Sequence, residues 1–138
     1  MKKLLLVLPL LFTTPLVLAI DSQDEDNYKQ NYTKQLHPLV IEKLSADRPE
    51  MTAQALKAEA DAYVTKMAEC QLKGLADFPE EYREQAIMPV AKGEDIAETT
   101  NALNQQMLAD IEAGKLSKDQ AEMMIGNAQE TVQMCLNS

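Results

Sequence analysis

The stretch MAECQLKGL, residues 67–75, contains one of the two cysteines in this 138-residue chain. Its pattern is typical of the last two turns of a helix, with Gly74 as the stop signal. Apolar residues recur upstream at spacings of three and four, and these positions form one helical stripe with Val64 beside it. The stripe consists of Leu56, Ala60, Tyr63, Met67 and Cys70. Cys70 is therefore expected on the buried side of its helix.

The second cysteine, Cys135, lies 65 positions later, at the end of the last apolar stripe of the chain. That stripe consists of Ala121, Ile125, Ala128, Val132 and Cys135. Both cysteines thus lie on buried faces near helix C-termini, and we expect two parallel helices whose last turns meet at a disulfide. Outside the cytosol two such thiols oxidise. A bridge closing a loop of this length stabilises a fold by about 4 kcal/mol in the chain-entropy model.

The segment AGKLSKDQA, residues 113–121, is the clearest turn signal in the chain. Gly114 suits a left-handed position just after a helix. Ser117 and Gln120 form the S-x-x-Q pattern of a capping box, which starts the next helix. Short turns of this kind join antiparallel helices. We therefore expect a helical hairpin around Gly114.

Three further segments, and the start of the helix that contains Cys70, show helical periodicity or helix boundaries. The first runs from Tyr28 and is expected to kink or break at His37, before Pro38. The helix that contains Cys70 is capped by Asp47, or alternatively by Thr52. A shorter segment lies between Pro79 and Pro89. Another helix follows over about 94–113. No period-two strand pattern occurs. The fold class is therefore all-α: a small bundle of about four main helices and one shorter helix, with one disulfide.

The first 19 residues have the pattern of a cleaved secretory signal peptide. Lys2 and Lys3 precede an apolar core, and Val17 and Ala19 occupy the small-residue positions before the cut. The apolar region is only 17 residues long and contains two prolines, which argues against a membrane anchor. Residues 20–27 are then expected as a flexible acidic segment, and residues 28–138 as a single helical domain. The predicted location is periplasmic or secreted.

The charge of the chain limits its partners. It has 13 basic and 22 acidic residues, and loss of Lys2 and Lys3 lowers the net charge from −9 to −11. Such a charge repels phosphate backbones and anionic lipids, so neither nucleic acid nor, after cleavage, a membrane is expected as a partner. The partner expected from this charge is a protein with a basic surface, and the simpler interpretation is that the charge serves solubility alone. The oligomeric state is left open.

Acidic residues are concentrated in the short segment after Pro79, which contains Glu80, Glu81 and Glu84. Connecting segments on rigid scaffolds often carry function. These three residues are therefore a candidate partner-binding face. Acidic residues in a first helical turn also stabilise the helix dipole, which is the alternative interpretation.

Catalytic and metal chemistry find little support in the sequence. His37 is the only histidine, no motif surrounds it, and the two cysteines lack the C-x-x-C spacing of redox pairs. Thioethers can bind Cu(I), but the methionines form no M-x-x-M or M-x-M cluster and are better explained as core residues. Met123 and Met124 are adjacent, so one of them is expected at the surface. We predict no enzyme activity, no catalytic residue, no cofactor and no metal site.

Residues 116–124, LSKDQAEMM, resemble the L-T-x-x-Q motif of the Spy and CpxP class of periplasmic helical chaperones. The resemblance implies a helical protein that shields unfolded chains without ATP. It covers nine residues, with Ser117 in place of threonine and no second copy, so no family is assigned. The leading function is non-enzymatic binding of another protein in the periplasm, either chaperone-like or immunity- and inhibitor-like. The alternative is a helical bundle that binds a small ligand or Cu(I).

The signal-peptide pattern makes a first prediction. The exported protein should begin at Ile20, because the small residues at 17 and 19 place the cut after Ala19. The intact mass of protein from the periplasmic fraction measures this directly. Recovery of the full-length chain from the membrane fraction would contradict it.

Overall fold

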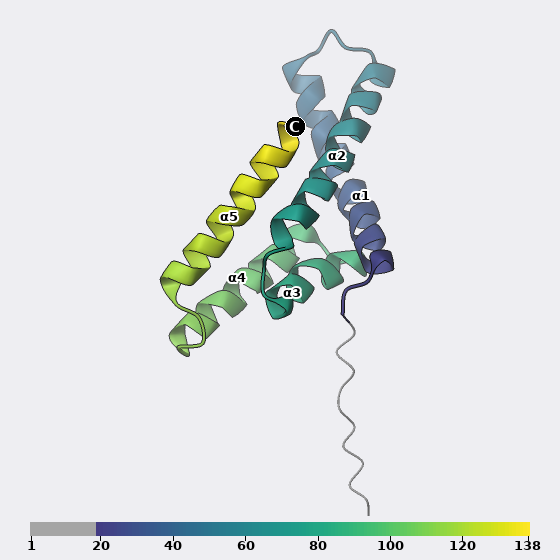
Figure 1. The fold of residues 1–138 in the computed structure, drawn as a ribbon. Coiled ribbons are helices and arrows are strands. Elements are labelled where there is room, and N and C mark those ends of the chain that lie inside the picture. The colour runs from purple at the N-terminus through teal and green to yellow at the C-terminus, as the bar shows by residue number, and fades with distance from the viewer. Residues whose placement is uncertain (1–18) are drawn as a thin grey trace, which may run out of the picture.

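The computed structural model describes residues 19–138, so the predicted signal peptide lies outside the described residues except for Ala19. The described chain contains five helices and no strand, which confirms the all-α class (Figure 1). The helices are α1 (Ser22–Asp47), α2 (Ala53–Leu75), α3 (Glu80–Ala91), α4 (Ile96–Glu112) and α5 (Lys118–Leu136).

Helix α1 begins earlier and runs further than the sequence indicated. Asp21 caps it in a reciprocal capping box with Asp24, so residues 22–27 are helical where a flexible segment was expected. The helix also continues through Pro38, where a kink or break was expected. Tyr28 and Tyr32, one turn apart, are buried with their rings 5.5 Å apart. They anchor α1 on the core shared with α2 and α3.

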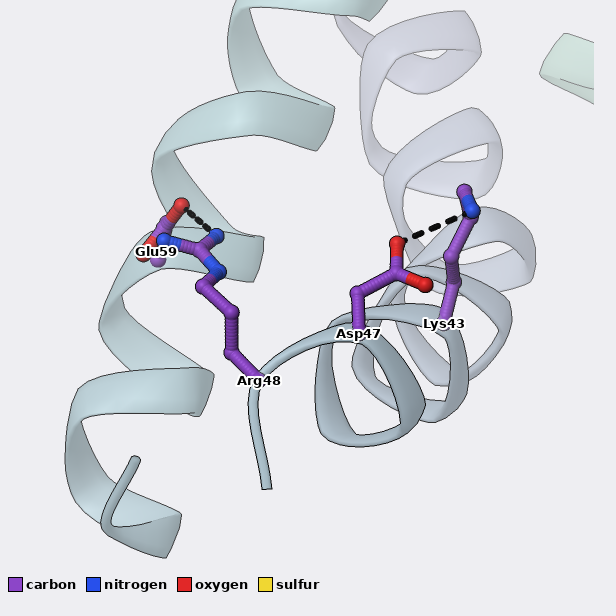
Figure 2. A network of polar contacts seen from close by, with 4 residues as sticks. All are labelled: Lys43, Asp47, Arg48 and Glu59. Atoms are coloured by element: carbon purple, nitrogen blue, oxygen red, sulfur yellow. Dashed lines mark hydrogen bonds and ion pairs between the residues drawn. The ribbon is translucent and has the colours of Figure 1, made fainter. Parts of the chain in front are cut away.

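A tight connection joins α1 to α2, and Thr52 rather than Asp47 caps α2. Asp47 is instead the last residue of α1, where it pairs with Lys43 at 3.0 Å. Arg48, just after α1, pairs with Glu59 of α2 across the connection (Figure 2). At its other end α2 continues to Leu75, so Gly74 lies inside the helix instead of stopping it.

Helix α3 ends at a glycine and not at its proline. Pro89 lies inside the helix, and Gly93 adopts φ +92° just after it. The amide of Gly93 donates to Val90 O and that of Glu94 to Pro89 O, which is the Schellman pattern of a helix end. Pro89 lacks an amide donor and crowds the residue before it, but burial of Ile87 and Val90 in the core holds the helix on both sides of the proline.

Side chains of α1 hold the connection between α3 and α4. Asn31 Nδ2 donates to Ala91 O at 3.0 Å, and Gln35 Nε2 donates to Glu94 O at 2.8 Å. Gln35 Oε1 also accepts from the amide of Ile96 at 2.9 Å, at the first residue of α4. These bonds satisfy backbone groups that helix ends leave unpaired. They also determine where α4 begins relative to α1.

The turn between α4 and α5 confirms the sequence prediction in detail. Gly114 has φ +74° and its amide donates to Ile111 O, while the amide of Lys115 donates to Asp110 O. Ser117 and Gln120 form the expected capping box at the start of α5. Both the stop and the start signal are local, so tertiary contacts leave them unchanged.

Helices α2 and α5 are bonded through Cys70 and Cys135, but they run antiparallel, not parallel as expected. Lys66 Nζ donates to the Ser138 carbonyl oxygen, whereas Gly74, eight residues further along α2, lies against Ala128. Residue numbers thus rise along α2 as they fall along α5 (Figure 1). The expectation failed because α3 is a complete helix that reverses the chain, and α4 does not return beside α2.

Two buried clusters make up the core. The first joins Tyr28 and Tyr32 of α1 with residues of α2 and α3, and Ile20 packs against it. The second lies where α3, α4 and the start of α5 meet, and contains Phe78, Tyr82, Leu103, Met107 and Ala121.

The contact of α2 with α5 makes a second prediction. A Cβ added at Gly74 would lie 2.8 Å from Val132 Cγ2 and 3.0 Å from Ala128 O, so Gly74→Ala must push α5 away from α2. We expect a net loss of about 1–2 kcal/mol, because overpacking outweighs the better helix propensity of alanine. Urea unfolding of the oxidised protein measures the change.

Gly126→Ala is the matched control within α5. A Cβ at Gly126 meets nothing within 4 Å, so this substitution should stabilise the protein by about 0.5–1 kcal/mol. Equal stability of the two variants would show that α5 does not depend on close approach at Gly74.

Candidate functional site

A groove opens between α4 and α5. The two helices share little contact beyond the turn that joins them, because α4 packs on α3 and α5 packs on α2. They diverge from that turn, with α2 lying between their far ends (Figure 1). The groove has a volume of about 890 Å³ and reaches down to Tyr28 and Tyr32 of α1.

The walls of the groove are apolar positions that the sequence pattern assigned to a bundle core. Leu103 and Met107 of α4 and Ile125 and Val132 of α5 line it, and the two α4 residues are only 8% and 4% exposed. In α5 only Ala121 is fully buried, while Ile125 is 38% exposed. The predicted stripe of α5 is therefore only half covered by α2. Apolar surface left open in this way is typical of a binding site.

Polar side chains without charge line the edges of the groove. They include Gln71 of α2, Asn104 of α4 and Gln129 and Gln133 of α5, and the one charged lining residue is Glu130. Amide side chains both donate and accept hydrogen bonds. The groove can thus bury an apolar surface in its centre and adapt to polar groups along its rims.

Gly126 lines the groove from the middle of α5. A glycine inside a helix destabilises it by roughly 0.5–1 kcal/mol relative to alanine. Unlike Gly74, it faces open space, so no contact among the described residues requires the missing side chain. The absence of a Cβ lets another backbone approach α5 closely at this point.

The helices that form the groove are strongly acidic. Together α4 and α5 carry six carboxylates, and their single basic residue is Lys118, which lies 3.6 Å from Glu122. Five of the carboxylates are exposed: Glu98, Glu112, Asp119, Glu122 and Glu130. The sixth, Asp110, is buried and structural.

The structure does not bring the predicted partner-binding residues to this groove. Glu80 and Glu81 are exposed in the first turn of α3, and Glu84 is half-buried with Oε1 shielded from solvent. The residues of α3 that line the groove are Ala86 and Val90. At 100° per residue, these positions are about 80° or more away from the three glutamates around the helix axis. The groove itself was missed because its apolar stripes had been assigned to a closed core.

The candidate metal-binding side chains are dispersed over the fold. His37 Nε2 lies 2.7 Å from Asp61 Oδ1, an ion pair between α1 and α2 when the histidine is protonated. Met107 and Met124 belong instead to the cluster under the α4–α5 turn, and Met123 is 62% exposed. One of the two adjacent methionines thus reaches the surface, as expected. Residues 19–138 hold no group of three or more His, Cys, Asp or Glu suited to a metal ion.

A buried polar network holds α3 against α4 beneath the groove. Tyr82 Oη donates to Asp110 Oδ2 at 2.7 Å, and Gln106 Nε2 donates to Asp110 Oδ1 at 3.1 Å. Burial, and then the hydrogen bond to Asp110, raise the pKa of Tyr82 to about 12. The network is structural, because it supports the α4 wall and none of its three side chains lines the groove.

A smaller hollow of about 430 Å³ lies near the α1–α2 connection. Leu39 and Tyr63, its most exposed apolar residues, are 59% and 47% accessible. Lys43, Asp47 and Glu59 at its rim already form the ion pairs seen in Figure 2. Fewer apolar residues line this hollow than line the groove, and its charged side chains already form ion pairs within the α1–α2 hairpin.

Comparison with protein-family models, curated proteins and solved structures found no match to this chain. None of the helices among residues 19–138 combines the length and apolar character needed to cross a membrane. The disulfide is typical of proteins outside the cytosol.

The Tyr82–Asp110 bond makes a third prediction. Tyr82→Phe leaves the buried Asp110 carboxylate with one fewer donor, so we expect a loss of about 1–3 kcal/mol near neutral pH. The raised pKa means that an unfolded chain ionises this tyrosine near pH 10 and the folded chain only near pH 12. The contribution of Tyr82 is therefore complete below pH 10 and is lost as the pH rises to 12. Chemical denaturation at both pH values measures it.

Tyr63→Phe, at an exposed tyrosine, is the control and should change stability by less than about 0.5 kcal/mol. A constant difference between wild type and Tyr82→Phe across the alkaline range would contradict the role given to this bond.

Proposed function

We propose that this chain is an exported, non-enzymatic protein that binds a segment of another protein in the groove between α4 and α5. The observation that carries the proposal is the groove with the half-covered apolar stripe of α5, where Ile125 is 38% exposed, beside the buried Leu103 and Met107 of α4. Solvation of such a surface is unfavourable, and burial against a partner removes that cost.

Three further features support a protein partner. The groove follows α4 from Ile96 to Met107 and α5 from Ile125 to Gln133, so it suits an elongated object more than an enclosed small molecule. Its amide-lined rims can adapt to varied polar groups. The signal-peptide pattern and the disulfide favour the periplasm as the place of action. Chaperone-like and immunity- or inhibitor-like binding both fall within the proposal.

A non-enzymatic role agrees with how the potentially reactive side chains are used. His37 is engaged with Asp61, and Asp110 is engaged with Tyr82 and Gln106. The cysteines are bonded to each other. Each of these groups holds helices together.

Small-ligand binding is the second candidate, because about 890 Å³ lies within the range of ligand pockets, which is roughly 300–1,000 Å³. Such pockets enclose most of their ligand, whereas this groove is open to solvent. Cu(I) binding has less support, since His37 and the methionines belong to different parts of the fold.

Site-specific photocrosslinking tests the proposed function. A benzophenone side chain at Ile125, in the groove, should give covalent protein adducts in periplasm. The same group at Met123, which is exposed but does not line the groove, is the matched control and should give none. Adducts in equal yield at both positions, or at neither, would contradict protein binding in the groove. A small-ligand site gives no protein adduct.

A further inference from the structure

We infer that the groove accepts an amphipathic α-helix with a basic polar face, which lies between α4 and α5 as an additional member of the bundle. The inference rests on the proposed function and specifies the partner's chemistry. It is carried by the form of the walls, by the position of Gly126 and by the charge of the two helices.

The walls favour a helical occupant over an extended one. Backbone groups within a helix are hydrogen-bonded to one another, so α4 and α5 offer no edge with which a strand could pair. An occupying helix satisfies its own backbone and needs only side-chain packing from the groove. The lining runs from Ile96 to Met107 on α4 and from Ile125 to Gln133 on α5, which is about 18 and 14 Å of helix, or about three turns.

Gly126 marks the point of closest approach for such a helix. It lies halfway along α5, lines the groove and faces open space. The same chain uses Gly74 in the middle of a helix contact, where Ala128 and Val132 of α5 press against the missing Cβ. Gly126 presents the same feature on the side of α5 that has no neighbour. Close helix packing explains a residue that otherwise only weakens α5.

Charge selects the polar face of the occupant. Exposed carboxylates occur along α4 and α5, and Glu130 lines the groove itself. A helix flanked by Lys or Arg is attracted by this field, and its association is faster at low salt. A second copy of this chain is a poor occupant, because two mature chains each carry a net charge of −11.

A synthetic helix provides the test. The chain has no tryptophan, so a peptide with one Trp on its apolar face reports binding by its own fluorescence. The probe has about 18 residues, or about 27 Å of helix, with a leucine face and a lysine face. We expect it to bind the oxidised mature protein at least about tenfold more tightly than a scrambled peptide or a Lys→Glu twin. Added salt should reduce the difference in affinity between the basic peptide and the Lys→Glu twin.

Two variants of α5 connect binding to the groove. Gly126→Leu fills open space without a clash, keeps helix propensity and should weaken the basic peptide about tenfold, equivalent to 1.4 kcal/mol. Asn127→Leu is the control, because it also introduces a leucine but at the next residue, which is exposed and does not line the groove. Its affinity for the basic peptide should stay within about twofold of wild type. Thermal unfolding of both variants confirms that they are folded.

The outcomes separate this inference from the proposed function. If the scrambled peptide or reduced, carboxymethylated α-lactalbumin binds as tightly and Gly126→Leu blocks it, the groove takes extended chain and the helical occupant is overturned. Equal binding of the Lys→Glu twin overturns the basic face. A dimer in sedimentation that Gly126→Leu dissociates assigns the groove to a second copy and also overturns the inference. In the first two cases crosslinks at Ile125 would still support protein binding.

Discussion

The attachment of α5 to α2 is the contact on which the rest of the structure depends. It combines a covalent bond between Cys70 and Cys135 with close approach at Gly74, where backbone and side chain of α5 fill the place of a Cβ. Elsewhere α5 is weakly held, since only Ala121 among its residues is fully buried. A helix with so little buried area needs a covalent tether to keep one position.

Because α5 is bound to α2, it covers α4 only in part, near the turn that joins the two helices. The apolar stripe of α4 is shared between α3, which it packs against, and the groove, which nothing in the described chain fills. The buried Tyr82–Asp110 pair strengthens the α3–α4 contact at the base of this wall. Asn31 and Gln35 of α1 hold the start of α4 through backbone hydrogen bonds. The groove therefore has two walls that are fixed independently, one by a disulfide and one by polar contacts.

The sequence predicted the local elements well where the signal was local. The glycine at 114 and the capping box of Ser117 and Gln120 define the turn between α4 and α5 almost to the residue. The disulfide between Cys70 and Cys135 was also predictable, from two cysteines on apolar faces in a chain with a signal-peptide pattern. Prolines were less informative: α1 and α3 continue past Pro38 and Pro89, because packing and a following glycine decide where each helix ends.

By itself, then, the sequence determined the all-α class, the turn at Gly114, the pairing of the cysteines and the acidity of the surface, since each depends on neighbouring residues or on composition. Only the tertiary structure decided that α2 and α5 run antiparallel, that Gly74 is a helix contact instead of a stop, and that the stripes of α4 and α5 line a groove. An apolar stripe shows that a helix face is to be covered, but not by which helix, or whether by this chain at all. That choice depends on helix directions set by contacts distant in sequence.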